Sequence, residues 1–204
     1  MAAPRVVRVD AAAPDLGVMR EAARVLRGGG LVAFPTETFY GLGAAGFDAA
    51  AARRVFVAKG RPSSMPLLLL VDSRAMAAAI VTEIPPRASE LMARHWPGAL
   101  TLVLRATSLI PDEVTAGTGT VGVRVPAHAV ARALVQALGE PVTAPSANPT
   151  GTPPPVTAAD VVRLLDGAVD LVLDGGVTAG GAPSTVLDVT IDPPRVIRQG
   201  AVLV

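Results

Sequence analysis

The chain contains no cysteine and only two histidines, His95 and His128. Without cysteine, disulfide bonds and thiolate metal ligands are excluded. A metal centre built from several histidines is not expected either. Any chemistry in this protein therefore depends on hydroxyl, carboxylate, amide and cationic side chains.

Aromatic side chains and net charge are also scarce. Phe, Trp and Tyr make up 3% of the 204 residues, and the formal net charge is +1 at pH 7. Base-stacking platforms need aromatic side chains, and broad nucleic-acid surfaces need clustered positive charge. The composition therefore argues against a large nucleic-acid-binding surface.

Long apolar runs are absent, although half of the residues are hydrophobic. No run approaches the roughly 20 residues that a membrane-spanning helix needs. The N-terminal sequence MAAPRVVRVD lacks the apolar segment of a signal peptide. We therefore expect a cytoplasmic protein with no membrane interaction.

Segments with the apolar spacing of strands alternate along the chain with segments that have the spacing of helices. This alternation indicates the α/β class, and a high Gly and Pro content with irregular connections favours a mixed sheet over a parallel one. We predict a single domain over 1–204, with a twisted mixed β-sheet and helices packed around it. The expected strands are 6–9, 31–34, 67–71, 100–104, 121–125, 142–144, 171–173 and 184–189.

Capping residues and prolines predict where several helices begin. Asp15 and Asp48 are plausible N-caps, and either Asp72 or Ser73 can cap a short alanine-rich helix. Thr157 with Asp160 resembles a capping box. Two further helices are expected to start at prolines, one running from 85–86 to His95 and one from Pro126 to Leu138. The segment 112–120 reads as a polar loop.

The segment from Leu31 to Val71 is the part of the chain around which the rest is organised. Its first strand stops at Pro35 and is followed by Thr36-Glu37-Thr38, and then by Tyr40-Gly41-Leu42-Gly43. The two glycines allow backbone amides to come close to a ligand. We interpret this stretch as half of an anion-binding active site.

Lys59 is the only lysine, beside 17 arginines. A lysine is a compact point charge that reaches a single phosphate or carboxylate oxygen, whereas arginine is a broad planar fork. One interpretation is a surface lysine that caps a helix C-terminus, where a cation is favoured. The neighbouring Gly60, Arg61 and Pro62 favour the other, in which Lys59 contacts an anionic ligand.

Three other segments carry polar side chains whose roles the residues alone leave open. Arg124 is flanked by valines in a strand, so it either pairs within the protein or holds an anion in a cleft. Ser146 and Asn148 lie two residues apart between prolines, although both residues are common in turns. His95 stands beside Trp96 at a helix end, where a packed or capping histidine is favoured over a general base.

Several motifs occur in one order: PTETFYGLG, AKGRP, HWPGALTLVL, TVGVRVPAH, APSANPTG, DGG, STVLDV and VIRQGA. With these motifs the chain resembles the YrdC-like threonylcarbamoyl-AMP synthases in their short, single-domain form. The resemblance runs from about Gly17 to Val202. It implies a YrdC-like fold with a central cleft.

The resemblance also implies an activity, in which L-threonine, bicarbonate and ATP with Mg²⁺ give threonylcarbamoyl-AMP and pyrophosphate. Partner transferases downstream then modify an adenosine beside the tRNA anticodon, and direct tRNA binding is expected to be weak or absent. Lys59 and Arg61 are implied as catalytic, and no protein metal ligand is implied. The residues implied to bind ATP are Lys59, Arg61, Thr120, Ser146, Asn148 and Arg198; those implied to bind threonine are Thr36, Arg124 and Ser184.

The sequence departs from the family pattern at Met65, Asp72 and Pro183, where the family usually has Asn, His and Glu. These positions concern the amino-acid pocket and its loop more than the phosphate side.

Two alternative functions are an RNA-binding module and a carbamoyl-adenylate-forming enzyme with another acceptor, as in hydrogenase maturation or antibiotic tailoring. The net charge of +1 argues against the first, and the standalone match argues against the second.

Overall fold

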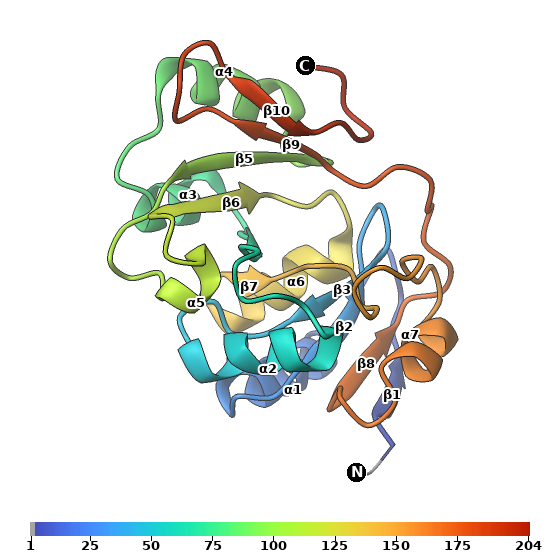
Figure 1. Cartoon of the computed structure of the whole chain (residues 1–204). Helices are drawn as coiled ribbons and strands as arrows, with labels where there is room; N and C mark the ends of the chain where they lie inside the picture. Colours follow the sequence, from blue (N-terminus) through green and yellow to red (C-terminus); the bar gives the residue numbers. More distant parts are fainter. Residues whose placement is uncertain (1–2) are drawn as a thin grey trace.

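The computed structural model describes residues 3–204, and its strands form two mixed sheets rather than the single sheet expected (Figure 1). The four-stranded sheet has the order β1 (Arg5–Arg8), β8 (Leu171–Asp174), β2 (Val32–Pro35) and β3 (Tyr40–Gly43). The six-stranded sheet has the order β10 (Arg195–Arg198), β9 (Thr185–Asp188), β5 (Leu100–Arg105), β6 (Thr120–Arg124), β4 (Leu68–Leu70) and β7 (Val142–Thr143). The α/β class and the mixed strand directions are confirmed.

The two sheets meet where the residues after β3 lie beside β7. Ala45 forms an isolated antiparallel bridge with Val142, and the Thr143 amide donates to the Ala44 carbonyl at 3.0 Å. The Thr143 hydroxyl also accepts from the Ala44 amide at 2.9 Å and donates to the Leu42 carbonyl at 3.1 Å. These bonds join the two sheets at this corner.

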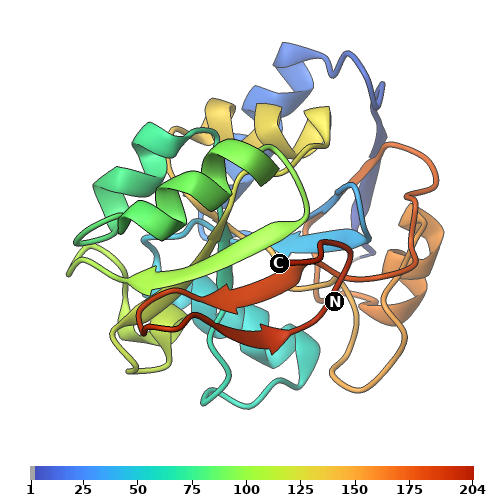
Figure 2. The same cartoon turned by 90° about the horizontal axis from the view of Figure 1, so that it is seen from above.

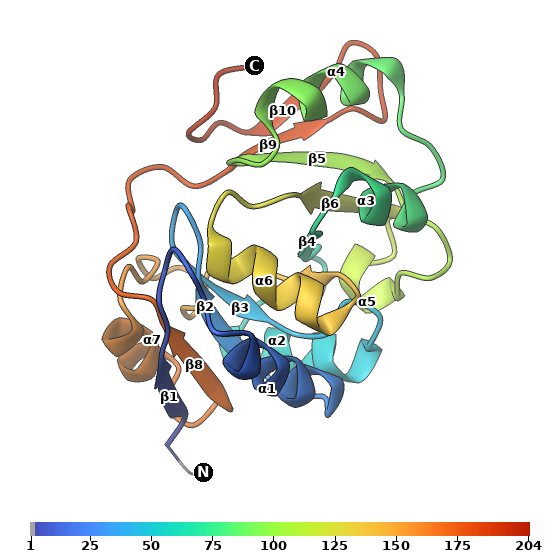
Figure 3. The ribbon, with the colours of Figure 1, turned by 180° about the vertical axis from the view of Figure 1, so that it is seen from behind.

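Helices cover both faces of the four-stranded sheet and one face of the six-stranded sheet. In Figure 3, α1 and α6 lie side by side in front of the smaller sheet, and α3 and α4 lie in front of the larger one. Viewed from above, the strands β5, β9 and β10 lie side by side, and β5 is the strand next to α4 (Figure 2). The helices are α1 (Leu16–Arg27), α2 (Ala49–Lys59), α3 (Arg74–Ile80), α4 (Pro86–His95), α5 (Asp112–Thr115), α6 (Ala129–Leu138) and α7 (Ala158–Leu164).

Alternation along β2 explains the two core clusters. Val32 and Phe34 pack with α1 and α6, whereas Ala33 belongs to the cluster that contains α2 and α7 residues. Successive side chains of a strand point to opposite faces, so a strand covered on both faces is apolar throughout. This accounts for the continuous apolar run that the sequence shows at this strand.

The expected helix starts are confirmed where a local side chain caps the helix. Asp15 accepts from the Val18 amide and Asp48 from the amides of Ala50 and Ala51. Ser73, not Asp72, caps α3. Thr157 caps α7 by accepting from the amide of Asp160, which is one half of the expected capping box, and its hydroxyl donates to the Asp160 carboxylate at 2.7 Å.

Two local expectations were wrong. The helix expected from Pro126 begins at Ala129, because His128 takes the N-cap position and accepts from the Val130 amide. Residues Asp112–Thr115 form the short helix α5 instead of a loop, and Val114 packs into the core. The four residues Tyr40–Gly43, whose glycines were expected to let backbone amides approach a ligand, form strand β3 paired antiparallel with β2.

Gly43 is required for packing in β3. A Cβ at this position would lie 2.8 Å from the Phe34 ring and 2.9 Å from a Val142 methyl group. Both neighbours are fully buried, so neither can move without disturbing the core.

We expect Gly43→Ala to lower the free energy of unfolding by about 1–3 kcal/mol, because overpacking a tight core has this cost. Denaturant unfolding followed by circular dichroism measures the effect. Gly28→Ala is the matched control, because a Cβ there has its nearest contact at 3.5 Å and needs no rearrangement. Equal stability of the Gly43 and Gly28 variants would contradict the packing argument.

Candidate active site between the two sheets

A cleft of about 1100 Å³ lies between the two sheets. Its walls come from strands of the six-stranded sheet, from β3, and from the segments that follow α2 and β7. All nine site residues predicted from the sequence line it: Thr36, Lys59, Arg61, Thr120, Arg124, Ser146, Asn148, Ser184 and Arg198. The structure thus brings these residues together, while their roles toward ligands stay predictions.

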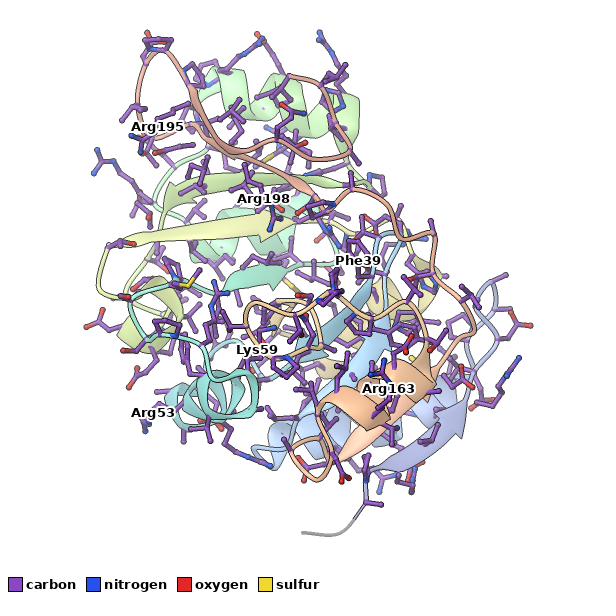
Figure 4. The ribbon with its side chains drawn as sticks, turned by 45° about the vertical axis from the view of Figure 1, so that its right-hand side comes forward. Phe39, Arg53, Lys59, Arg163, Arg195 and Arg198 are labelled. Atoms are coloured by element: carbon purple, nitrogen blue, oxygen red, sulfur yellow. The ribbon has the colours of Figure 1, made fainter. Side chains whose placement is uncertain are left out.

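One wall of the cleft is a face of the six-stranded sheet. Because side chains alternate along a strand, every second residue of β5, β6 and β9 points to this face. The face contributes Thr101 and Val103, then Thr120, Gly122 and Arg124, then Ser184, Val186 and Asp188. A register shift between Val196 and Arg198 interrupts β10 beside it. Such a bulge re-aims a side chain, and Arg198 points towards the region between the sheets (Figure 4).

The opposite wall contains the C-terminal end of α2, which ends at Lys59 because Gly60 adopts the left-handed conformation with φ of 54°. The Arg61 guanidinium donates to the carbonyls of Met65 at 3.2 Å and Pro66 at 2.9 Å, and so stabilises the turn before β4. In Figure 4, Lys59 lies towards the middle of the molecule, whereas Arg53 and Arg163 lie on its outer surface.

Lys59 is 3% exposed and joins the two distant loops that were predicted to form one site. Its ammonium donates to the Asn148 carbonyl at 2.6 Å and to the Ser146 carbonyl. The Lys59 carbonyl in turn accepts from the Thr150 amide at 2.7 Å. An ammonium has three donors, so one remains for a ligand, and the interpretation of Lys59 as an exposed capping residue was wrong.

Burial lowers the pKa of Lys59 to about 8, and the nearby positive charge of Arg61 acts in the same direction. Burial also lowers the pKa values of Arg61 and Arg198, with smaller contributions from Arg198 on Arg61 and from Arg124 on Arg198. Cations that depress one another's pKa are stabilised together by an anion. The cleft is therefore electrostatically suited to a multiply charged anionic ligand.

Arg124 is 4% exposed and lies between the cleft and the carboxylate of Glu37, whose Oε2 is 3.6 Å from the Arg124 Nη2. Burial lowers the pKa of Arg124, and the charge of Glu37 opposes this shift. The Nε of Arg124 and both oxygens of Glu37 are buried without a hydrogen-bond partner among the described residues. Both alternatives for Arg124 therefore hold in part: it pairs within the protein and it also faces the cleft.

The Thr36 hydroxyl is engaged within its own turn. It donates to the Phe39 carbonyl at 2.7 Å and accepts from the Thr38 amide at 3.2 Å. Thr38, which also lines the cleft, carries a second hydroxyl 3.1 Å from that of Thr36. The sequence indicated this hydroxyl pair, but not that the first member forms the turn.

Asn148 is fixed in its turn by its side-chain amide, which donates to the Thr152 carbonyl at 2.7 Å and the Pro149 carbonyl at 3.1 Å. Its Oδ1 is buried without a partner among residues 3–204. A buried acceptor of this kind is costly unless it is satisfied. A ligand donor or an ordered water in the cleft can supply the missing bond.

The cleft residues that the sequence reasoning missed include Thr101, Phe39, Asp188 and Arg195. Thr101 and Asp188 sit on strands that were recognised, and their face could have been inferred from alternation with Arg124. The Asp188 carboxylate accepts from the Thr190 hydroxyl at 2.6 Å, and its Oδ2 lies 3.6 Å from the Arg195 Nη2.

Within the described residues no group of three or more His, Cys, Asp or Glu side chains is placed to hold a metal ion.

His95 ends α4 and has no part in the cleft lining. The adjacent Trp96 donates through its indole to the Leu100 carbonyl at 2.7 Å. The interpretation of His95 as a packed residue agrees with that placement.

Over residues 3–204, no helix combines the length and the apolar character needed to cross a membrane.

The comparison with known proteins agrees with this geometry. A family model for Sua5, YciO and YrdC proteins, described as "Telomere recombination", matches residues 24–200. The chain belongs to this family. The resemblance seen in the ordered motifs is confirmed.

Relatives within the Sua5/YciO/YrdC family include two proteins named threonylcarbamoyl-AMP synthase. The protein from Pyrococcus abyssi is 45% identical over 182 residues, which cover 89% of this chain and 54% of the relative. The protein from Thiobacillus denitrificans is 41% identical over 163 residues, which cover 80% of this chain and 86% of the relative. The chain thus spans about half the length of the first relative and most of the second.

A solved structure of P. abyssi Sua5 complexed with L-threonine matches the chain with a TM-score of 0.92 and 42% identity, and it covers 96% of this chain and 57% of that one. The expected YrdC-like fold is therefore confirmed.

Of the three departures from the family pattern, Met65 and Pro183 line the cleft. Asp72 is not part of the cleft lining, and its carboxylate accepts from the Ser73 hydroxyl.

We expect ATP affinity to fall as the pH rises through the pKa of Lys59, which is about 8. Only the protonated amine attracts phosphate, so binding at pH 9 should be about tenfold weaker than at pH 7. Isothermal titration calorimetry across this range measures the effect. Lys59→Gln is the control and should bind more weakly with a flat profile; the same slope in this variant would assign the pH dependence to another group.

Proposed function

We propose that this protein is an L-threonylcarbamoyladenylate synthase, a nucleotidyltransferase that uses L-threonine, bicarbonate and ATP. The observation that carries the proposal is the contact of Lys59 with both the Ser146 and the Asn148 carbonyls. This contact aligns the ammonium, the Arg61 guanidinium and the Ser-Ala-Asn turn on one side of the cleft. The names of the relatives at 41–45% identity support the same activity.

The chemistry needs no protein nucleophile. The threonine amine condenses with bicarbonate, water leaves, and an oxygen of the resulting carbamate attacks the α-phosphorus of ATP. The bond between that phosphorus and the bridging oxygen breaks, and pyrophosphate departs with the electron pair. Negative charge gathers on phosphate oxygens, and fixed cations aimed at them lower the barrier. Lys59 and Arg61 are proposed to supply these charges, with Ser146, Asn148, Thr120 and Arg198 also contacting ATP.

The amino-acid side of the cleft is proposed to lie at Thr36, Arg124 and Ser184. Arg124 faces the threonine carboxylate, and a second anion in addition to Glu37 compensates its buried charge. Placing both substrates in one enclosed cleft orients the carbamate oxygen toward the α-phosphate. The structure with L-threonine of the related P. abyssi Sua5 supports an amino-acid site in this fold.

Magnesium is proposed to enter with ATP. Asp188 is the one carboxylate in the described lining of the cleft, and it already accepts from Thr190 and lies 3.6 Å from Arg195. This donor set fits an ion held by phosphate oxygens and water, because Mg²⁺ usually keeps several waters and takes few protein ligands. When bound, the ion neutralises phosphate charge.

The product is a reactive mixed anhydride, so a transferase must consume it. We propose that this step is the threonylcarbamoylation of an adenosine beside the tRNA anticodon, in the cytoplasm, by a partner protein. Direct tRNA binding by this chain is proposed to be weak, because its formal net charge is only +1.

Incubation with ATP, Mg²⁺, bicarbonate and each amino acid in turn tests the function. We expect pyrophosphate release and an adenylate product with threonine, and neither when bicarbonate is removed. Product mass spectrometry identifies the adenylate. Pyrophosphate release that is independent of threonine would overturn the substrate assignment. RNA affinity that is steeply salt-dependent without nucleotide would instead favour an RNA-binding module.

We expect Lys59→Arg to lower kcat/KM for ATP by at least tenfold although the positive charge is kept. The guanidinium fork is broader than an ammonium, and the site at Lys59 is 3% exposed with two carbonyls already in contact. Arg53→Lys, at an exposed surface position that pairs with Glu113, is the control and should retain wild-type kinetics. Wild-type turnover of Lys59→Arg would remove Lys59 from the site.

A further inference from the structure

Ser184 lies at the junction of two cleft regions and is 3% exposed. Its hydroxyl oxygen is 3.0 Å from the Thr101 hydroxyl of β5 and accepts from Arg198 Nη2 at 3.0 Å. Ser184 is a proposed threonine contact and Arg198 a proposed ATP contact, whereas Thr101 has no role in the preceding proposal. The three side chains form a short hydrogen-bonded chain along the sheet wall.

The direction of the hydrogen bond between Arg198 and Ser184 follows from the donors available. Arg198 can only donate, so Ser184 must accept from it. Within residues 3–204 the Thr101 hydroxyl has no partner other than Ser184, and Thr101 is 1% exposed. Between Thr101 and Ser184 either hydroxyl can donate, and in each case one hydroxyl proton is left facing the cleft, where it needs a ligand or a water as acceptor. In the arrangement taken for the proposal below, Thr101 donates, and Ser184 accepts two bonds and keeps its own proton free for a ligand.

The orientation of Thr101 is set by its neighbour on β6. A Cβ at Gly122 would approach the Thr101 methyl group to 3.1 Å, so the absence of a side chain at Gly122 leaves room for that methyl. With the methyl group against Gly122 and the hydroxyl against Ser184, Thr101 has a single well-packed rotamer. β-branched side chains hold such a rotamer firmly.

The backbone at Ser184 is also held in place. Arg198 donates through Nη2 and Nε to the Ser184 carbonyl at 2.8 Å and 3.1 Å, and the Ala201 amide donates to the Pro183 carbonyl at 2.9 Å. A Cβ at Gly200 would lie 2.1 Å from that carbonyl oxygen, so the C-terminal segment packs directly on this turn. Rotation of the Ser184 side chain is the remaining freedom, and the hydrogen bonds of its hydroxyl with Thr101 and Arg198 restrict it.

We propose that Thr101 is a positioning residue that makes the Ser184 hydroxyl a fixed hydrogen-bond donor to the amino-acid substrate. This inference rests on the proposed function. Ser184, Arg198 and Arg124 then all present hydrogen-bond donors. The ligand group that fits beside them is a negatively charged hydrogen-bond acceptor. The recognised group is the carboxylate of the amino acid or the carbonyl oxygen formed from it.

Thr101→Val tests the proposal because valine keeps the branched shape and removes the donor. We expect the KM for threonine to rise about tenfold, with the KM for ATP changed less than twofold, since Ser184 loses its fixed orientation. Thr101→Ser restores the hydroxyl and should return the KM for threonine to within about threefold of wild type. Steady-state pyrophosphate release with each substrate varied in turn supplies these values.

A double-mutant cycle separates positioning from a general loss of structure. Ser184→Ala removes the group on which Thr101 acts, so adding Thr101→Val to that variant should raise the KM for threonine no further. Thr143→Val is the matched control: its hydroxyl is buried in the sheet corner, and it is outside the cleft lining. It should lower the melting temperature without changing the KM for threonine.

The outcomes distinguish this inference from the proposed function. Threonine-dependent turnover by the wild type together with an unchanged KM in Thr101→Val overturns the role of Thr101 alone. Additive effects of Thr101→Val and Ser184→Ala also overturn it, because Thr101 would then act independently. If no amino acid supports pyrophosphate release by the wild-type protein, the proposed function and this inference both fail.

Discussion

The ammonium of Lys59 binds the carbonyls of Ser146 and Asn148, which lie 87 and 89 residues further along the chain. The proposed nucleotide side of the cleft depends on this junction. A buried cation without partners is costly, so the carbonyls of Ser146 and Asn148 are needed to keep the charge inside. The amide of Thr150 returns a bond to the Lys59 carbonyl. The helix end and the proline-bounded turn therefore hold each other, and neither defines its side of the cleft alone.

The concentration of positive charge in the cleft follows from that arrangement. Burial lowers the pKa values of Lys59, Arg61 and Arg198, and in each case a neighbouring arginine lowers the pKa further: Arg61 for Lys59, Arg198 for Arg61 and Arg124 for Arg198. Neighbouring positive charges repel one another, and a bound anion offsets this repulsion. The site therefore favours the binding of ligands with several negative charges. Glu37, whose Oε2 lies 3.6 Å from the Arg124 Nη2, partly compensates the buried charge of Arg124.

Local signals in the sequence predicted local structure well. The caps at Asp15, Asp48 and Thr157 depend on residues within one helical turn, and the structure confirms each of them. The packing role of Gly43 was not evident from the sequence, because its small size serves contacts with Phe34 and Val142, and the second of these is almost a hundred positions away. Pro126 was misinterpreted because the side chain of His128 competes for the helix start.

The sequence by itself determined the α/β class through apolar periodicity, and the family through its ordered motifs, since both are properties of neighbouring residues. The resemblance to that family then gave the nine side chains that line one cleft. Only the tertiary structure decided that the strands form two sheets, that the Thr36 hydroxyl is used within its own turn, and that Thr101 contacts Ser184. Those outcomes depend on contacts between segments far apart in the chain. Such contacts are set by how all the elements pack together, and no short stretch of sequence encodes them.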